Sequence, residues 1–441
     1  MIETLIANIE NRTYTIGVIG LGYVGLPLVW TFYQNGFPLI GFDVDRQKID
    51  ALKAGRSYIK HFRDDQIDGM MKSGKVQVTT EFSRVADVDA ILMCVPTPLD
   101  GHREPDMSYV QSTVESVAPH LKKGHLLVLE STTYPGTTDE LIKPLAERIS
   151  GLTANNDFYL AYSPEREDPG NPDFRTASIP KVVGADSDEA RKLASALYDA
   201  AIVETVPVSS TRTAEAVKLL ENIFRSVNIA LVNELKVVFE KMDIDVYEVI
   251  NAAKTKPFGF MAFYPGPGLG GHCIPIDPFY LTWKAREFGV NTRFIELAGE
   301  VNTSMPGYVT ERTIEALNSK KKALNGSKVL CLGLAYKPNV DDMRESPTYV
   351  IMDQLTGYGA EVDYYDPYIP EIPVTREHAN WAGKKSVEWD EQTVSGYDAV
   401  IICTNHDEID YTELLEWQNC IIDTRNAMNT LLNTNGKVWK A

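Results

Sequence analysis

Short apolar runs, each followed by a turn rich in polar residues, glycine or proline, recur along the first 209 residues. Runs of this length with many β-branched residues predict strands, and the longer stretches between them have room for helices. Strands that alternate with helices are typical of an α/β fold with a parallel sheet. The predicted strands are Tyr14–Gly20, Pro38–Phe42, three runs that end at Cys94, Ser131 and Ser163, Ile179–Val183 and Ile202–Val206.

The stretch from Ser210 to about Met242 contains neither proline nor glycine and places apolar residues at helical spacing. This predicts one helix of roughly 45 Å, long enough to connect two domains. Further helical patterns run from Pro278 to about Leu317. The lysine-rich connection Asn318–Ser327 then marks a domain boundary.

A second α/β pattern begins with the apolar run Lys328–Leu334 and continues with strands near Glu361–Tyr365, Tyr397–Cys403 and Cys420–Asp423. The fold class is therefore α/β, with two Rossmann-like, doubly wound parallel-sheet domains joined by a long central helix. The predicted divisions are residues 1–209, a central helical part at 210–318, and 319–441.

The chain of 441 residues carries a net charge of −18, from 43 basic and 61 acidic residues. Such a balance argues against a nucleic-acid or anionic-membrane partner. The five cysteines show no C-x-x-C spacing, which argues against a disulfide framework or a metal site and favours a reducing cytoplasm. No signal peptide and no apolar run of membrane-spanning length is found.

The sequence G-L-G-Y-V-G, from Gly20 to Gly25, directly follows the first strand and precedes a helix predicted to begin near Val24. This is the setting of the dinucleotide fingerprint, in which a pyrophosphate lies on the helix N-terminus. Asp43, at the end of the second strand, is placed to bind a ribose 2′-hydroxyl and favours NAD over NADP. The alternative is a structural turn with an ordinary surface aspartate. The predicted cofactor-binding residues are Gly20, Gly22, Tyr23, Val24, Gly25, Asp43, Arg46, Thr97 and Thr132.

Thr97, Thr132 and Glu165 lie in the turns that follow three successive strands. The turns after parallel strands meet at the carboxyl edge of the sheet, where ligands bind, so these residues are predicted to line a pocket. Thr132 could hold a water molecule. The alternative role of the two threonines is as helix N-caps.

Four glycines precede Cys273 in the stretch Y-P-G-P-G-L-G-G-H-C-I-P-I-D-P, which begins at Tyr264. A cysteine among exposed backbone N–H groups can act as a thiolate nucleophile. If the segment is helical, Asp277 returns to the same face, where it could orient a water. The alternative is a buried cysteine in a glycine- and proline-rich turn.

Lys218 and Asn222 are four residues apart on the predicted long helix and share a face. An ammonium and an amide that point together into a cleft can stabilise an oxyanion. A solvated lysine is the alternative.

The first turn of the second α/β pattern, A-Y-K-P-N-V-D-D-M-R-E-S-P, presents Lys337 and Arg344 before a helix capped near Ser346. Two cations at the carboxyl edge of a sheet suggest a second anionic ligand. The alternative is ion pairing with Asp341 and Asp342.

Taken together, these motifs resemble the UDP-sugar 6-dehydrogenases of the UDP-glucose/GDP-mannose dehydrogenase family, over nearly the whole chain and in the same order. The variants S-P-E-R-E-D-P-G-N and G-G-H-C-I-P-I-D-P are similar to those of the UDP-N-acetylhexosamine branch. They place Asp168, His272 and Ile276 where UDP-glucose enzymes differ. The lysine of the P-K-D motif in those enzymes is absent here, so any cofactor contact that it makes is made differently or lost.

The resemblance implies that two NAD⁺ and one water oxidise the C6 alcohol of a UDP-sugar to a carboxylate, through a thiohemiacetal and a thioester on Cys273. Lys218 and Asn222 would stabilise oxyanions, Asp277 with Thr132 would position the water, and Glu165 would assist thioester hydrolysis. It also implies a cytoplasmic homodimer built on the long helix, with Arg344 at the interface, and a product used in polysaccharide biosynthesis. The implied substrate-binding residues are Glu165, Arg166, Lys218, Asn222, Lys256, Gly270, Lys337 and Arg344.

UDP-N-acetylglucosamine is the substrate that the resemblance favours, with UDP-glucose and UDP-N-acetylmannosamine as alternatives. A one-step dehydrogenase and a non-catalytic nucleotide-sugar sensor on the same fold are further alternatives. The number of NADH formed per sugar separates these hypotheses, since the mechanism on Cys273 requires two.

Overall fold

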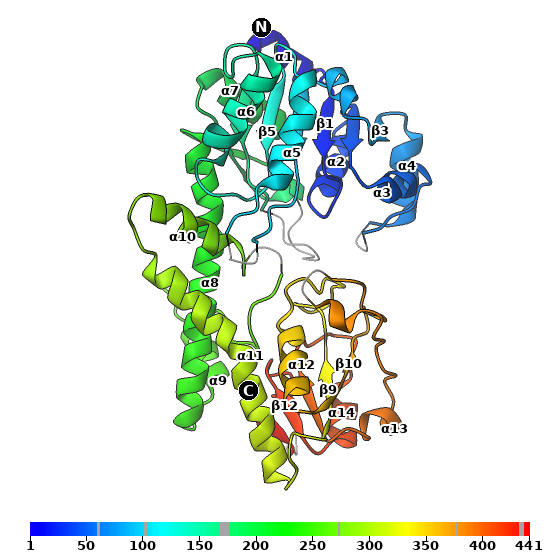
Figure 1. Cartoon of the computed structure of the whole chain (residues 1–441), viewed down its shortest axis with the longest axis vertical. Coiled ribbons are helices and arrows are strands. Elements are labelled where there is room, and N and C mark those ends of the chain that lie inside the picture. The colour runs from blue at the N-terminus through cyan, green and yellow to red at the C-terminus, as the bar shows by residue number, and fades with distance from the viewer. Residues whose placement is uncertain (60–61, 101–103, 167–175, 272–273, 376–377, 432–435) are drawn as a thin grey trace. The chain divides into compact units, whose positions relative to one another are not determined.

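The computed structural model describes residues 1–59, 62–100, 104–166, 176–271, 274–375, 378–431 and 436–441. They form two compact units, residues 1–221 with 279–291, and residues 222–278 with 292–441. Figure 1 labels many of the elements of both units. The three-part division expected from the sequence, at 210 and 319, stays a prediction.

Among the described residues of the first unit, eight strands form one sheet in the order β3-β2-β1-β4-β5-β6-β7-β8. Neighbouring strands are parallel except β6 and β7, which meet antiparallel at Tyr162 and Gly184. The seven strands predicted for this part of the chain are present, and β3 is an addition. The strands are β1 Ile16–Ile19, β2 Leu39–Phe42, β3 Val76–Thr79, β4 Ala90–Met93, β5 Leu126–Leu129, β6 Tyr159–Tyr162, β7 Lys181–Gly184 and β8 Thr205–Val208.

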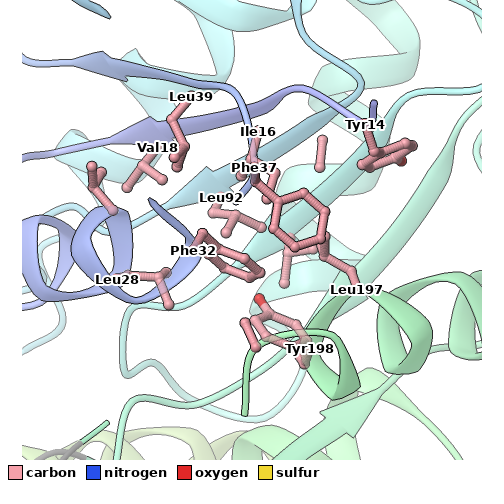
Figure 2. Packing of buried hydrophobic residues seen from close by; sticks show 14 of the residues in the cluster. Tyr14, Ile16, Val18, Leu28, Phe32, Phe37, Leu39, Leu92, Leu197 and Tyr198 are labelled. Carbon is pink, nitrogen blue, oxygen red and sulfur yellow. The ribbon is translucent and has the colours of Figure 1, made fainter. Parts of the chain in front are cut away.

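Strands β1, β2, β4, β5, β6 and β7 are buried throughout, and the first five of these are almost continuously apolar, as expected of strands that helices cover. The largest buried cluster joins one face of the sheet to helices α1, α2 and α7. Figure 2 shows its aromatic centre, where Phe32, Phe37 and Tyr198 pack beside Ile16 and Leu92. The helices of this unit are α1 Ile2–Glu10, α2 Gly25–Gln34, α3 Arg46–Lys53, α4 Asp64–Lys72, α5 Ser108–Val117, α6 Lys143–Ser150 and α7 Asp188–Asp199.

The second unit contains a parallel five-stranded sheet in the order β10-β9-β11-β12-β13. Successive residues of β9 belong to different buried clusters: Leu330 and Leu332 to one, Val329 and Cys331 to the other. Side chains alternate across a strand, so both faces of this sheet are covered, as a doubly wound fold requires. The strands are β9 Lys328–Leu332, β10 Glu361–Tyr365, β11 Ala399–Ile402, β12 Ile421–Asp423 and β13 Val438–Lys440, of which β13 was not expected from the sequence.

The long helix predicted from Ser210 to Met242 is α8, Thr211–Lys241, and its residues divide between the two units. Helix α10, Asp277–Glu287, is divided in the same way. None of the helices that the structure describes combines the length and the apolar character needed to cross a bilayer. The other helices of the second unit are α9 Val246–Ala253, α11 Arg293–Ser319, α12 Pro347–Gly357, α13 Glu391–Val394 and α14 Tyr411–Trp417.

Candidate active site and nucleotide sites

The glycine turn after β1 is shaped by two glycines that tolerate no side chain and one that leaves open space. Gly20 has a φ of +87°, and a Cβ there would lie 2.3 Å from the carbonyl oxygen of Cys94. A Cβ on Gly25, the first residue of α2, would lie 1.9 Å from the carbonyl oxygen of Gly20. A Cβ on Gly22 would meet nothing within 4 Å. The turn therefore presents bare backbone beside a helix N-terminus, and a dinucleotide pyrophosphate fits there.

Asp43 binds the glycine turn through its carboxylate. Its Oδ2 accepts the N–H of Leu21 at 2.8 Å and its Oδ1 accepts the N–H of Asp45 at 2.9 Å, while the Lys48 ammonium lies 3.3 Å from Oδ2. The Tyr58 hydroxyl donates to the carbonyl oxygen of Leu21 at 2.5 Å. A carboxylate offers about four acceptor positions, so one is left for a ribose hydroxyl.

The other residues predicted to contact the cofactor at this edge are half-buried or exposed. Tyr23 and Val24 form the half-buried turn before α2. Arg46 begins α3, and its exposed guanidinium lies 4.0 Å from Asp50. Their contacts with a cofactor stay predictions.

The turns after β4 and β5 meet, as expected from the sequence. The Thr97 hydroxyl donates to the carbonyl oxygen of Thr132 at 2.7 Å, and the Tyr280 hydroxyl donates to the carbonyl oxygen of Thr97. Neither threonine is a helix N-cap, because the next helical segments begin at Ser108 and Thr137. The N-cap alternative is therefore wrong for both.

Glu165 and Arg166 follow β6 at the same edge of the sheet. Glu165 is half-buried. Arg166 donates to the carbonyl oxygen of Pro180 at 2.8 Å and forms an ion pair with Glu221 of α8. The charge of Arg166 is thus already balanced within the chain, and its contact with a substrate stays a prediction. Asp168 lies outside the described residues.

Lys218 and Asn222 are buried on α8, each with 7% of its surface exposed. The alternative of a solvated lysine is therefore wrong. Asn222 Nδ2 donates to Oδ2 of Asp277 at 2.5 Å, which joins an amide of α8 to the first residue of α10. An uncharged donor therefore holds this carboxylate in place.

The cysteine loop ends differently from the helical expectation. Cys273 and His272 lie outside the described residues, and Ile274–Ile276 form a turn before α10 begins at Asp277. The helical condition on which the sequence argument for Asp277 depended is therefore not met at residues 274–276. A proline at position 275 disfavours helical backbone in the residue before it, which explains the late start of the helix.

The glycines before Cys273 pack closely against the segment that carries Lys337 and Arg344. The N–H of Gly271 donates to the carbonyl oxygen of Arg344 at 2.9 Å. A Cβ on Gly270 would lie 2.6 Å from the Cβ of Tyr336 and 2.9 Å from the carbonyl oxygen of Glu345. Glycine is required because two loops from distant parts of the sequence touch through their backbones.

The predicted substrate cations of the second unit lie in different surroundings. Arg344 forms a two-pronged ion pair with Asp342, its Nη2 2.6 Å from Oδ2, so the ion-pair alternative holds for this residue. Lys337 is half-buried, with its ammonium 5.8 Å from the centre of the Tyr336 ring. Lys256 lies on an exposed stretch, over the ring of Phe258. Their roles toward a substrate stay predictions.

Two basic residues that the sequence did not single out, one buried and one half-buried, lie at the start of the glycine loop. Lys236 of α8 donates to the carbonyl oxygen of Gly266 at 3.1 Å, and burial together with Arg425 lowers its pKa to about 7. Arg425 follows β12 and donates to the carbonyl oxygen of Cys403 at 2.7 Å. A Cβ on Gly266 would lie 2.6 Å from the Arg425 guanidinium. The only signal in the sequence was an arginine directly after a predicted strand.

Asp366, at the end of β10, repeats the arrangement of Asp43 in the other sheet. Its Oδ2 accepts the N–H groups of Leu334 and Ala335 in the first turn after β9, at 2.7 and 2.9 Å. Its Oδ1 accepts the N–H of Tyr368, two residues on. Here the remaining acceptor position is taken, because the buried His406 ring lies 3.2 Å from Oδ2.

The chain matches three profiles of the UDP-glucose/GDP-mannose dehydrogenase family in order. Residues 14–202 match the NAD binding domain, residues 212–304 the central domain and residues 330–430 the UDP binding domain.

Individual relatives span most of the chain. It is 36% identical over 395 residues to a UDP-N-acetyl-D-glucosamine 6-dehydrogenase of Pseudomonas aeruginosa, covering 89% of this chain and 90% of the relative. It is 34% identical over 426 residues to a UDP-N-acetyl-D-mannosamine dehydrogenase of Pyrococcus horikoshii, covering 94% and 96%. A solved structure of a UDP-D-ManNAc dehydrogenase from Pyrococcus horikoshii matches with a TM-score of 0.87 at 31% identity, over 97% of this chain and 98% of that one.

Proposed function

Because the chain belongs to the UDP-glucose/GDP-mannose dehydrogenase family, we propose that it oxidises the C6 hydroxyl of a UDP-N-acetylhexosamine to a carboxylate, through covalent intermediates on Cys273. Its cofactor is NAD and its substrate class is the UDP-sugars, as the matched NAD binding and UDP binding domains indicate. We divide it into an NAD-binding part (1–209), a central part (210–318) and a UDP-sugar-binding part (319–441).

The hydrogen bond between Asn222 and Asp277 is the observation that carries this proposal. Both side chains are buried, and Asp277 follows Cys273 by four residues. A buried amide and carboxylate beside a cysteine segment are unnecessary for a one-step dehydrogenase. They suit a reaction that needs both an oxyanion donor and a positioned water.

In the proposed reaction each group of the chain has one role. NAD⁺, when bound, supplies a hydride acceptor for each of the two oxidations. The Cys273 thiolate adds to the C6 aldehyde, and Lys218 and Asn222 stabilise the developing oxyanions. After the second hydride has left, water held by Thr132 and Asp277 attacks the thioester, with Glu165 as its base.

UDP-N-acetylglucosamine is the substrate that we place first, since a UDP-N-acetyl-D-glucosamine 6-dehydrogenase is 36% identical to the chain. UDP-N-acetylmannosamine is the second candidate, supported by the mannosamine dehydrogenase of similar identity. Contacts with the sugar nucleotide are assigned to Arg166, Lys256, Gly270, Lys337 and Arg344. We place the activity in the cytoplasm, because a catalytic thiol has to stay reduced.

We further propose that the protein is a homodimer formed through α8. Phe224, Leu231 and Val238 are 47%, 52% and 45% exposed and recur every seven residues, so they lie on one face of the helix. A repeated apolar face of this kind is typical of a helix that packs against another copy.

The deciding experiment measures NADH per sugar with UDP-N-acetylglucosamine, UDP-N-acetylmannosamine and UDP-glucose in parallel, together with the three specificity constants. We expect two NADH per sugar and the highest constant for UDP-N-acetylglucosamine. One NADH per sugar contradicts the covalent mechanism, and no turnover of any UDP-sugar contradicts the assignment as an enzyme. Cys273→Ser is expected to abolish net turnover, because its hydroxyl is a poorer nucleophile and leaving group.

A further inference from the structure

A buried ion pair lies directly beneath the turns after β5 and β6. The ammonium of Lys181, on β7, lies 2.6 Å from Oε2 of Glu130, the residue that follows β5. The Glu130 side chain is fully buried and that of Lys181 is 6% exposed. The reaction proposed above assigns this pair no role.

The same ammonium also holds the turn that carries Glu165. Lys181 Nζ donates to the carbonyl oxygen of Pro164 at 3.2 Å. On its other side, Glu130 precedes the turn with Thr132 by two residues. Lys181 is therefore bonded to the segment of Glu165 directly and to the segment of Thr132 through Glu130. These are two of the residues proposed to position and activate the water.

Tyr198 fixes the position of this pair within the core. Its hydroxyl donates to Oε1 of Glu130, and its ring centre lies 5.1 Å from the Lys181 ammonium. The ring itself belongs to the aromatic cluster of Figure 2. The ion pair is thus a rigid support, because its partners cannot move without disturbing that cluster.

The charges around Lys181 do not balance as a simple pair. Burial lowers the pKa of Lys181, but the carboxylates of Glu130 and then Glu165 outweigh it and raise the pKa above its ordinary value. The acidic neighbours of Lys181 therefore favour its charged form. A buried ion pair contributes little net stability compared with apolar residues of the same size, so its presence calls for another reason.

We propose that Lys181 is a positioning residue for thioester hydrolysis, which fixes the turn of Glu165 through the carbonyl oxygen of Pro164 and the turn of Thr132 through Glu130. The proposal rests on the function proposed above. In this step water adds to the acyl carbon and the C–S bond breaks. The electron pair returns to the Cys273 sulfur, and the products are the carboxylate, the thiolate and two protons, the first of which Glu165 accepts.

The test compares three variants of the full-length protein by rapid-mixing measurement of NADH and by mass spectrometry of the quenched protein. Glu130→Gln/Lys181→Met removes both charges and so avoids leaving one of them unpaired. It is expected to release two NADH per site in a burst, then turn over about 10- to 100-fold more slowly while the acyl adduct accumulates. Glu130→Gln alone keeps the bond from Lys181 to Pro164 but loses the charged bond to the Thr132 segment, so it is expected to slow hydrolysis less than the double variant does.

Lys181→Arg keeps a cation at this position, and it provides the test if the doubly neutral variant does not fold. Hydrolysis within about threefold of the parent rate supports the proposal, and a loss with adduct accumulation overturns it, because the proposal requires a cation at this place. The matched control is Asp188→Asn/Arg191→Met, which removes the exposed ion pair of α7 with the same change of charge. It is expected to behave as the parent does.

The outcomes separate this proposal from the proposed function. One NADH per sugar, or none, in the parent protein refutes the covalent mechanism itself. Two NADH in the parent, with unchanged hydrolysis and no adduct in the folded doubly neutral variant, leave that mechanism standing and overturn the role of Lys181.

Discussion

Glu215 of helix α8 accepts the backbone N–H of Gly136 at 2.6 Å, and so ties the turn after β5 to the helix that bears Lys218. Its other oxygen accepts the N–H and the hydroxyl of Thr138 at 2.9 and 2.7 Å. The side chain is fully buried. Three donors thus satisfy a carboxylate that has no access to water.

Glu215 is expected to make stability depend on pH near neutrality. Burial raises its pKa from 4.5 to about 7, against the effect of its three donors. Below pH 4.5 the group is protonated in both states and its contribution is complete. As pH rises from 4.5 to 7, Glu215 ionises in the unfolded chain but stays protonated in the folded one. The free energy of unfolding therefore falls by roughly 3 kcal/mol.

The measurement is the free energy of unfolding of the first cooperative transition between pH 4.5 and 8, for the parent and for Glu215→Gln. The variant cannot titrate at this position, so its curve is expected to be flatter over that range. Glu10→Gln, an exposed substitution on α1, serves as control. Parallel curves for the parent and Glu215→Gln would contradict the assignment.

Substitution by alanine at Gly22 and at Gly25, in the turn after β1, is expected to have different effects on stability and on NAD affinity. Gly22→Ala adds a methyl group to open space, so stability should change by less than about 0.5 kcal/mol, while NAD affinity falls about tenfold or more. Gly25→Ala forces a Cβ to within 1.9 Å of a carbonyl oxygen and should cost about 1–3 kcal/mol or more. Thermal unfolding and NAD titration check both, and a Gly22→Ala protein with parent-like NAD affinity would place the pyrophosphate elsewhere.

Asp43→Asn is expected to weaken NAD binding by about 10- to 100-fold and to reduce the ratio of NAD affinity to NADP affinity. The amide keeps the size of the side chain but loses the negative charge that repels a 2′-phosphate. Calorimetric titration with both cofactors checks this. Asp50→Asn, an exposed change on α3, is the control, and equal effects of the two substitutions would show that the ribose is held elsewhere.

Leu231→Glu/Val238→Glu is expected to convert the proposed dimer to monomers in sedimentation velocity, since two carboxylates would be buried in the interface. Val203→Glu introduces a carboxylate at another exposed apolar position, 65% exposed in the parent, and should leave the oligomeric state unchanged. A parent protein that sediments as a monomer would refute the dimer directly.

The sequence predicted the parts of the fold that local patterns encode. The apolar runs gave the strands around Gly20 and Thr97, and the long stretch free of proline and glycine gave α8. β3 and β13 were missed because each is short and contains polar residues, as in V-Q-V-T and V-W-K. Such segments become strands through their neighbours in the sheet rather than through their own pattern.

The buried charges could not be predicted from the sequence. Glu130 and Lys181 are 51 residues apart, and Glu215 accepts from a turn residue 79 positions away, so no local spacing links them. Charged residues are almost never fully buried unless they are paired, so a charged residue in a sequence is normally predicted to lie on the surface. Asn222 and Asp277 were both singled out, but their direct hydrogen bond depends on where α10 begins, which the prolines around Asp277 decide.

The aspartate at the end of β10 has a consequence for how the two halves of this chain are related. Asp43 and Asp366 each anchor the first turn of a sheet and the residue two positions on, yet the second sheet has no glycine fingerprint, and His406 fills the position left open in the first. A search for common ancestry of the two halves should therefore compare the aspartate after the second strand of each sheet, and not the glycines. In the C-terminal half the four contacts of this aspartate are all made within the chain, so its role there is to hold the turn after β9 in place.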